Sequence, residues 1–333
     1  MFQIHFHPDI NEQYKQTVES FIKDWQDNDI KQITSHSSGS TGKPKSILLS
    51  KKQMIQSAKM TGEFFNFRKG QSILLCLSPE FIAGKMMLVR AITWELEVYV
   101  VTPDSKVLSF PDKKQFDFVA MVPNQLEKWM SFIIDKTIQF KAILLGGATI
   151  SRSLEQTIKA EKLPVYLSFG MTETTSHIAI KNISIENQAY KAIGNTTFST
   201  NPFNQLIIHS PELEISELIT NDIIELLSPT EFHWKGRLDY VINSGGIKYF
   251  PEELEKKIQD SGLTERFFIF GQKEEKLGEI IAICIEGKES SIDKDAILAQ
   301  LNRYERPKKW YFIDQFEETN SGKINRIKTQ EKL

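Results

Sequence analysis

The segment SSGSTGKPK (37–45) has the composition of a loop that holds phosphate. Gly39 and Gly42 allow backbone geometry that directs consecutive N–H groups at one anion. Lys43 and Lys45 supply positive charge. Hydroxyl donors come from Ser37, Ser38, Ser40 and Thr41. A flexible Gly/Ser linker is the alternative, because composition by itself does not separate the two.

The spacing of this segment differs from that of the phosphate loop of P-loop NTPases. That motif has four residues between its glycines and Ser or Thr after its lysine, whereas here two residues separate the glycines and Pro44 follows the first lysine. The following SILLS (46–50) is strand-like, and Ser50 with Gln53 forms a capping box for a helix. We therefore expect the loop to lie between two strands, as a hairpin-like flap.

A second candidate segment reads YLSFGMTETTSH (166–177) and follows a buried strand. It carries Gly170, Thr172 and Glu173 at a strand end, which is where open parallel sheets bind ligands. A glutamate there can hold Mg²⁺, and a threonine hydroxyl can reach a phosphate oxygen. An ordinary turn with a solvated acid is the alternative.

Two later segments carry further candidates. Asp222 and Arg237 suit the hydroxyls of a ribose, although a turn residue and a surface charge are the simpler interpretations of each alone. Gly245 and Gly246 form either a simple turn or a stretch of backbone past which a ligand chain fits. The last segment reads ETNSGKINRIK and carries Lys323, with a frayed basic tail as the alternative.

The elements that position these residues follow from hydrophobic periodicity. A helix over 11–25 opens the chain. From about residue 73 to 170, buried strands alternate with helices, which predicts a mainly parallel α/β sheet covered on both faces. The predicted strands are SILLCL, LEVYVVT, FDFVAMV, KAILLGG and LPVYLSF, and the predicted helices cover 84–94, 123–135 and 151–162.

The pattern changes twice after this region. Short strand-like pieces between 176 and 235 predict an antiparallel subdomain. PEELEKKIQDSG then reads as a helix, followed by strands RFFIFG, GEIIAICIEG and KKWYFID and a helix around 292–303. We predict a large domain over 1–236 and a small, mobile α+β domain over 237–333.

Bulk properties exclude some classes of function. The 333 residues are 40% hydrophobic and 25% charged, which is typical of a globular protein. The net charge of −2 gives no field that favours nucleic acid. No apolar run is long enough to span a membrane, and no signal peptide is recognisable. Cys76 and Cys284 lie in apolar runs, as reduced core residues of a cytoplasmic protein do.

In this order and spacing the segments resemble the adenylate-forming acyl-CoA synthetase superfamily. The family pattern has a [ST]SG[ST]TG-x-PK loop, a [YF]G-x-TE strand end, a TGD aspartate, a GR-x-D hinge followed by SGG, and a C-terminal GK lysine. The matching residues are Ser38–Lys45, Phe169–Glu173, Thr220–Asp222, Gly236–Asp239, Ser244–Gly246 and Gly322–Lys323. The short chain and the runs ILLGGATIS and FIAGKMMLVRA further resemble the o-succinylbenzoate–CoA ligases of menaquinone biosynthesis.

The resemblance implies an ATP-dependent acid–thiol ligase. A carboxylate attacks the α-phosphate of ATP to give an acyl-adenylate and pyrophosphate, and the thiol of coenzyme A then displaces AMP. It assigns catalysis to Lys323, Lys45, Thr172 and Glu173, with Mg²⁺ on Glu173. The residues that it assigns to ATP or coenzyme A are Ser38, Gly39, Ser40, Thr41, Gly42, Gly146, Gly147, Ala148, Gly170, Asp222, Arg237, Asp239, Gly245 and Gly246.

The two steps require different positions of the C-terminal domain. Lys323 would bridge the carboxylate and the α-phosphate in the first step, cancelling repulsion. The domain would then swing about Asp239, bringing the SGG segment over the site so that Gly245 and Gly246 flank the pantetheine channel. An interdomain salt bridge is the simpler role of Asp239, and it does not exclude the hinge.

Three departures from the family pattern concern the acyl pocket and leave the nucleotide site as the pattern has it. Only 36 residues precede the first loop, so from the resemblance we expect part of the pocket wall to be missing or to come from a second subunit of a homodimer. The TGD motif reads TND, and Phe81 stands where relatives often have a histidine. Arg90, His177 and Lys181 could meet a second carboxylate, with packing or surface roles as the simpler interpretation.

The identity of the acid therefore stays open at this point. Alternatives to o-succinylbenzoate are another acyl or aryl acid, loading of a carrier protein in place of coenzyme A, and a catalytically inactive nucleotide-binding protein.

Overall fold

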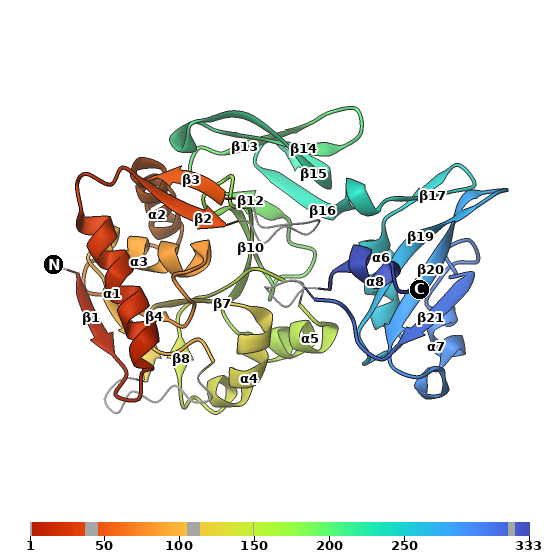
Figure 1. Cartoon of the computed structure of the whole chain (residues 1–333), viewed down its shortest axis with the longest axis horizontal. Coiled ribbons are helices and arrows are strands. Elements are labelled where there is room, and N and C mark those ends of the chain that lie inside the picture. Colours follow the sequence, from red (N-terminus) through yellow and green to blue (C-terminus); the bar gives the residue numbers. More distant parts are fainter. Residues whose placement is uncertain (1, 37–45, 105–113, 149, 319–323) are drawn as a thin grey trace. The chain divides into compact units, whose positions relative to one another are not determined.

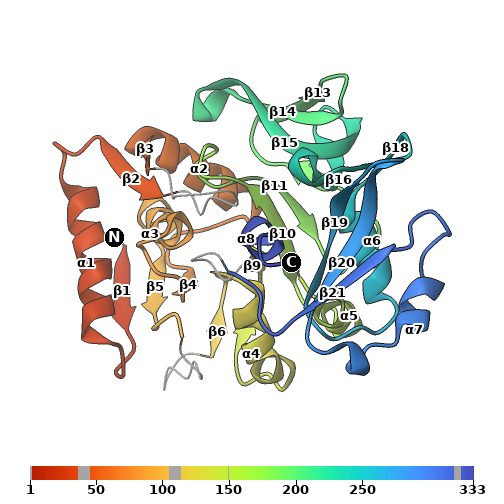
Figure 2. The same cartoon turned by 45° about the vertical axis from the view of Figure 1, so that its right-hand side comes forward.

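The computed structural model describes residues 2–36, 46–104, 114–148, 150–318 and 324–333. These residues form two compact units. Unit 1 draws on the spans Met1–Ser37, Pro44–Thr197 and His209–Glu217, and unit 2 on Phe198–Ile208 and Leu218–Leu333. Figures 1 and 2 show the chain coloured from red at the N-terminus to blue at the C-terminus.

Unit 1 opens with helix α1 (Glu12–Gln26), which confirms the helix predicted over 11–25. Asn11 caps it by accepting a hydrogen bond from the backbone N–H of Tyr14 at 3.0 Å. Tyr14, Val18 and Phe21 form its buried face. Their spacing of three and four residues is the helical period that the sequence shows.

The sheet of unit 1 is mainly parallel. Its strands, in sheet order, are β1 (Gln3–Phe6), β5 (Glu97–Val100), β4 (Ser72–Leu75), β7 (Phe118–Met121), β9 (Ile143–Leu145), β10 (Val165–Gly170), β11 (His177–Asn182) and β12 (Tyr190–Ala192). All neighbouring pairs from β1 to β10 are parallel, whereas β10–β11 and β11–β12 are antiparallel. Every residue of β4, β7 and β9 is buried, as a sheet covered on both faces requires.

Helices cover both faces of this sheet. The helices that follow α1 are α2 (Lys51–Phe64), α3 (Ile82–Trp94), α4 (Pro123–Ile134) and α5 (Arg152–Ala160). On one face, α4 and α5 lie beside one another (Figures 1 and 2) and share a core with Val119 of β7. Phe118, the preceding residue on that strand, faces the other side and contacts Phe65 after α2, with ring centroids 5.0 Å apart.

A separate hairpin precedes α2. Strands β2 (Gln32–His36) and β3 (Ser46–Ser50) pair antiparallel, and His36 opposite Ser46 is the last pair. The predicted strand over 46–50 and the capping box are confirmed, since Ser50 Oγ accepts from the N–H of Gln53 at 3.1 Å. The two short strands β6 (Gln115–Phe116) and β8 (Gln139–Phe140) pair parallel elsewhere in unit 1.

Unit 2 contains two groups of strands. The first, in sheet order, is β16 (Glu231–Arg237), β15 (Ile215–Ser228), β14 (Gln205–Ser210) and β13 (Thr197–Thr200), some of whose end residues belong to unit 1. The second is β18 (Ile247–Tyr249), β17 (Ile242–Ser244), β20 (Gly278–Glu286) and β19 (Phe267–Glu274), with β21 (Lys309–Ile313) parallel to β20. Its helices are α6 (Pro251–Gln259), α7 (Lys294–Ala299) and α8 (Arg326–Gln330), and η1 (Pro211–Leu213), η2 (Leu238–Tyr240) and η3 (Glu289–Ser291) are short 3₁₀ turns of the chain.

The predicted fold class is confirmed: a mixed α/β chain with a mainly parallel sheet, antiparallel strands after it and a smaller α+β part at the C-terminus. Cys76 and Cys284 are both buried and free. Helix α7 is shorter than the helix expected around 292–303. Within the described residues, no helix is both long and apolar enough to cross a membrane.

Candidate functional site

The end of β10 in unit 1 carries the predicted phosphate and magnesium residues. The register between β10 and β11 shifts after Phe169, so that Gly170 lies opposite His177. A side chain at Gly170 would place its Cβ 2.2 Å from the carbonyl oxygen of Ser176. Only glycine therefore allows the two strands to approach here and the chain to leave the sheet as a tight turn.

Threonine side chains hold this turn. Thr174 is fully buried, and its Oγ1 accepts from the N–H of Met171 at 3.0 Å and donates to the carbonyl of Ser176 at 2.7 Å. Thr175 has φ of 66°, a conformation that β-branched residues rarely adopt. Its N–H donates to the carbonyl of Thr172 at 2.9 Å. The turn is thus fixed from within, and it leaves Thr172 half-buried and Glu173 exposed.

A buried cluster lies directly under the turn. Arg90 of α3 is 2% exposed, and its guanidinium donates to Ser176 Oγ at 2.9 Å and to Thr61 Oγ1 at 3.2 Å. His177 Nε2 lies 3.1 Å from the same Thr61 oxygen. Among the described residues, no carboxylate forms an ion pair with Arg90. Lys181, the third candidate for a second carboxylate, instead lies over the ring of Tyr190 at 4.9 Å.

Burial changes the acid–base properties of this cluster. It lowers the pKa of Arg90 to about 9. Burial and, secondarily, the neighbouring Arg90 charge lower the pKa of His177 well below its ordinary value. His177 is therefore neutral at physiological pH and accepts or donates hydrogen bonds without adding a second charge. Through the hydrogen bond from Arg90 to Ser176, the cluster helps to hold the turn in place.

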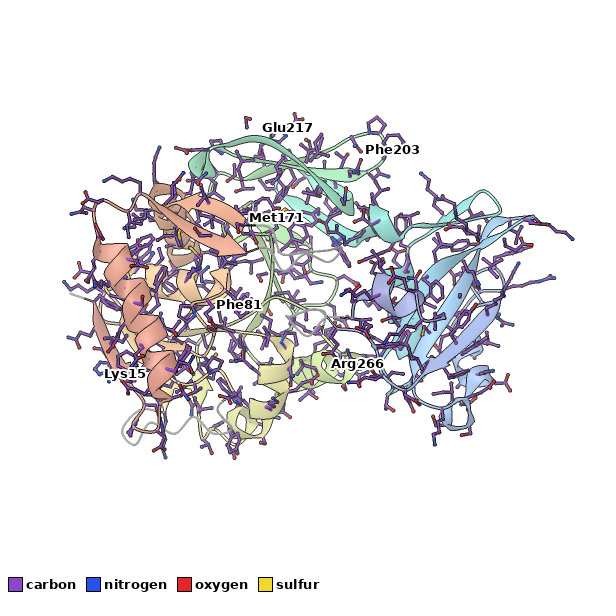
Figure 3. The ribbon with its side chains drawn as sticks, in the orientation of Figure 1. Lys15, Phe81, Met171, Phe203, Glu217 and Arg266 are labelled. Atoms are coloured by element: carbon purple, nitrogen blue, oxygen red, sulfur yellow. The ribbon has the colours of Figure 1, made fainter. Side chains whose placement is uncertain are left out.

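The other candidates of unit 1 also follow strand ends. Gly146 comes directly after β9, and its N–H donates to the carbonyl of Met121 at 3.2 Å. Gly147 has φ of 86°, which favours glycine, and Ala148 is exposed. Phe81, which precedes α3, is 51% exposed, and Figure 3 labels it together with Met171 of the turn.

Asp222 and Arg237 form part of one network in unit 2. They are opposite each other on β15 and β16. Asp222 is 6% exposed; its Oδ1 accepts from the indole N–H of Trp234 at 2.8 Å, and its Oδ2 lies 3.9 Å from Arg237 Nη1. Burial raises the pKa of Asp222, while Trp234 and Arg237 oppose that rise by stabilising the charged form.

Asp239, in η2, is held by two side chains. Arg237 Nη2 donates to its Oδ2 at 2.7 Å. Asn221 Nδ2 lies 3.0 and 3.3 Å from its two oxygens. Arg237 thus reaches both carboxylates, although it lies much closer to Asp239 than to Asp222.

Helix α6 brings a further carboxyl group to this region. A Cβ at Gly236 would lie 2.5 Å from Glu252 Oε2, an oxygen that is buried and has no hydrogen-bond partner among the described residues. Burial raises the pKa of Glu252 to about 7, and the nearby Glu255 adds to that rise while Arg326 opposes it. Arg326 pairs with Glu255 at 2.9 Å and stacks over the Tyr240 ring at 4.8 Å.

Gly245 and Gly246 connect β17 to β18. Their φ values of 59° and 82° are both positive, as the two central residues of a type I′ hairpin turn require. No described atom lies within 4 Å of a Cβ built on Gly246. Its surroundings are thus open, which is compatible with either of the roles considered for these glycines.

Several predicted site residues lie outside the described residues: Ser38, Gly39, Ser40, Thr41, Gly42, Lys45 and Lys323. The structure brings Thr172, Glu173 and Gly170 together in unit 1, and Asp222, Arg237 and Asp239 together in unit 2. Sequence reasoning missed Trp234, Asn221, Thr61 and Glu252. The departure of TND from TGD was the one signal that pointed to Asn221.

Within the described part of the chain, no group of three or more His, Cys, Asp and Glu side chains could hold a metal ion. A surface hollow of about 600 Å³ in unit 1 is lined by α1, β2 and Lys85. None of the described site residues of unit 1 lines it.

Comparison with known proteins identifies the family. The family of AMP-binding enzymes matches residues 10–212, more than half of the chain. The chain belongs to this family. A solved structure from Dyadobacter fermentans, described as an acyl-CoA synthetase (AMP-forming)/AMP-acid ligase II-like protein, is 32% identical, with 98% of this chain and 96% of that chain covered and a TM-score of 0.63.

Other relatives of this AMP-binding enzyme carry a narrower description. The 2-succinylbenzoate–CoA ligase of Enterococcus faecalis is 25% identical, covering 92% of this chain and 71% of the relative. The solved o-succinylbenzoate CoA synthetase of Bacillus subtilis, in complex with the acyl-adenylate intermediate, has a TM-score of 0.77 at 20% identity and covers 88% of this chain and 68% of that one. The predicted family and the prediction of an AMP-forming ligase are confirmed at the level of the family.

Proposed function

We propose that this AMP-binding enzyme activates a carboxylic acid as its acyl-adenylate and transfers the acyl group to coenzyme A, with o-succinylbenzoate as the acid. The observation that carries the proposal is the turn after β10. It presents Thr172 and Glu173 at the strand end where parallel pairing gives way to antiparallel pairing. In open α/β sheets, ligands bind outside the carboxyl ends of the strands.

The first step joins an anion to a polyanion, so charge must be neutralised. Glu173 is an exposed carboxylate, which suits Mg²⁺, because that ion uses one or two carboxylates together with water and substrate phosphates. Mg²⁺ bound with ATP supplies charge neutralisation to the departing pyrophosphate. Thr172 contacts the α-phosphate, and the loop from Ser38 to Gly42 with Lys45 holds the other phosphates.

The ribose and the reacting carboxylate have separate partners. Asp222, with its Oδ1 already accepting from Trp234, offers Oδ2 to a ribose hydroxyl, and Arg237 assists. Gly146, Gly147 and Ala148 border the adenine and the acyl group. Lys323 bridges the attacking carboxylate and the α-phosphate and thereby orients them.

The second step needs the lysine to leave. We assign residues 1–236 to the adenylation domain and 237–333 to a mobile domain that rotates about Asp239. Gly245 and Gly246, which form an open turn, then flank the pantetheine arm of coenzyme A. A homodimer stays a prediction, to be tested by the mass of the protein in solution.

The choice of acid rests on relatives that are 23–25% identical. Arg90 is too deeply buried to contact the acid in the described conformation, so it supports the turn and does not select a dicarboxylate. The second candidate is a ligase for another acyl or aryl acid, or one that loads a carrier protein. It is favoured by Phe81, which is exposed where many relatives have a histidine beside the substrate.

An exchange assay tests the proposal. Incubation with ATP, labelled pyrophosphate and one acid at a time should return label into ATP with o-succinylbenzoate, and less with benzoate or medium-chain fatty acids. Addition of coenzyme A should then give the thioester. Exchange with other acids only would overturn the choice of o-succinylbenzoate. Exchange without thioester would point to a carrier protein, and no exchange with any acid would contradict adenylate formation.

A further inference from the structure

The hinge carboxylate has a partner that the family pattern lacks. Asn221 stands where the TGD motif has glycine, and glycine has no side chain with which to reach another residue. Here the Asn221 amide approaches both oxygens of Asp239, at 3.0 and 3.3 Å. This contact joins the middle of β15 to η2, across 18 residues of chain.

The Asp239 carboxylate therefore forms hydrogen bonds to side chains from two strands. The guanidinium of Arg237, the last residue of β16, donates to Oδ2 at 2.7 Å. The amide of Asn221 reaches the carboxylate from β15. Because β15 and β16 pair directly, with Asp222 opposite Arg237, the carboxylate is held against a rigid ladder. A rotation of the chain about Asp239 has to break or stretch both contacts.

The two contacts differ in what else they do. Arg237 also lies 3.9 Å from Asp222, so its replacement would disturb the acid assigned to the ribose. Asn221 is exposed, and Asp239 is the side-chain partner of its amide in the described structure. Asn221 is thus the one of the two whose removal changes the hold on Asp239 without removing an assigned ligand residue.

We propose that Asn221 is a positioning residue of the hinge, whose amide stabilises one setting of Asp239 and has to release it before the other setting is reached. This inference rests on the proposed two-step function. If it holds, the ratio of the rates of the two half-reactions depends on a residue that contacts neither ATP nor the acid. A hydrogen bond to a partly exposed carboxylate contributes a modest free energy, so the expected change in balance is also modest.

Asn221→Ala and Asn221→Gly test the proposal. Both should change the ratio of adenylate formation to thioester formation from pre-made adenylate, by about fivefold, as expected for loss of one such hydrogen bond. The alanine variant excludes an effect of glycine on the backbone. In an Asp239→Ala background, Asn221→Ala should have no further effect on the ratio, because its partner is gone.

Asn187→Gly is the matched control. Asn187 is exposed in unit 1 at φ of 51°, a conformation that glycine adopts without strain. It should leave the ratio unchanged. An unchanged ratio in both Asn221 variants, or equal loss of both half-reactions, would overturn the proposal.

Hydrogen exchange gives a readout that does not depend on activity. The amides of residues 238–243 should exchange about fivefold faster in Asn221→Ala than in the unsubstituted protein. Equal hydrogen-exchange rates in the two proteins would overturn the proposed hold of Asn221 on Asp239, even if the ratio of the two half-reactions changed. If the unsubstituted protein forms no adenylate with any acid, the proposed function fails, and the exchange rates alone decide whether Asn221 holds η2.

Discussion

Asp222 and Asp239 are two carboxylates of one network with opposite surroundings. Asp222 is buried and receives the Trp234 indole N–H, whereas Asp239 is partly exposed and is held by Arg237 and Asn221. Burial raises the pKa of Asp222, and its hydrogen bonds oppose that effect. A buried acid with one oxygen satisfied suits a fixed ligand, while a partly exposed acid with breakable contacts suits a hinge.

Glu252 allows a prediction about pH at the scale of one residue. Burial raises its pKa to about 7, above the ordinary value of 4.5. The folded state therefore holds the proton more tightly than the unfolded state does. The stability contributed by this group is fully present below about pH 4.5 and is lost as the pH rises through 7.

Glu252→Gln should remove this loss of stability with rising pH. Between pH 5 and pH 8 the free energy of unfolding of the unsubstituted protein should fall by about 1 to 3 kcal/mol more than that of the variant. Urea unfolding at the two pH values measures the difference. Glu253→Gln is the control, because Glu253 is exposed on the same helix. Parallel pH profiles for Glu252→Gln and the unsubstituted protein would show that the group is already ionised at pH 5.

At this scale the sequence predicts residue types better than partners. The sequence pattern proposed Asp222, Arg237 and Asp239 as site residues, but it did not point to Trp234 and Glu252, since both come to the network through strand pairing and helix packing. The Glu252 carboxyl group on α6 lies close to Gly236 only because α6 packs beside β16 in the folded chain. No local pattern encodes that approach.

At the scale of elements, the bulge at the end of β10 decides where Thr172 and Glu173 lie. The strand itself was predicted from its apolar run, as were β4, β5, β7 and β9. The register shift after Phe169 was not, because it depends on the pairing of β10 with β11. Helix α7 ends at Ala299, earlier than its pattern predicts; the N–H of Asn302, beyond that end, donates to the Glu305 carboxylate at 3.1 Å.

Gly170→Ala tests the importance of this bulge. The added Cβ would lie 2.2 Å from the Ser176 carbonyl oxygen and 2.5 Å from His177 Cα, so β10 and β11 would have to separate. We expect a loss of stability of about 1 to 3 kcal/mol. The acid-dependent exchange of labelled pyrophosphate into ATP should fall by a larger factor than the folded fraction of the protein does, because the turn that carries Thr172 moves.

Gly70→Ala is the matched control for that substitution. Gly70 has φ of 79° and no described atom within 4 Å of an added Cβ. Its replacement should lower the free energy of unfolding by about 1 kcal/mol through backbone strain. The rate of pyrophosphate exchange per folded molecule should stay unchanged. If Gly170→Ala retained that rate as well, the bulge would not position the site.

For the whole molecule, the proposed chemistry draws on both units. Thr172 and Glu173, which we propose for the phosphates and Mg²⁺, belong to unit 1, and Asp222, Arg237 and Asp239, which we propose for the ribose and the hinge, belong to unit 2. The order of these motifs along the chain predicted the family, which the match over residues 10–212 confirmed. The identity of the acid could not be predicted in the same way, because acyl selectivity depends on the shape of a pocket and not on a motif.

We propose that Lys323 serves the first step and leaves for the second. Measurement of Lys323→Ala in both half-reactions tests this role. Adenylate formation, followed by acid-dependent exchange, should fall by at least about a hundredfold. Conversion of pre-made acyl-adenylate and coenzyme A to thioester should stay near the rate of the unsubstituted enzyme. Equal loss of both half-reactions would contradict the role proposed for Lys323.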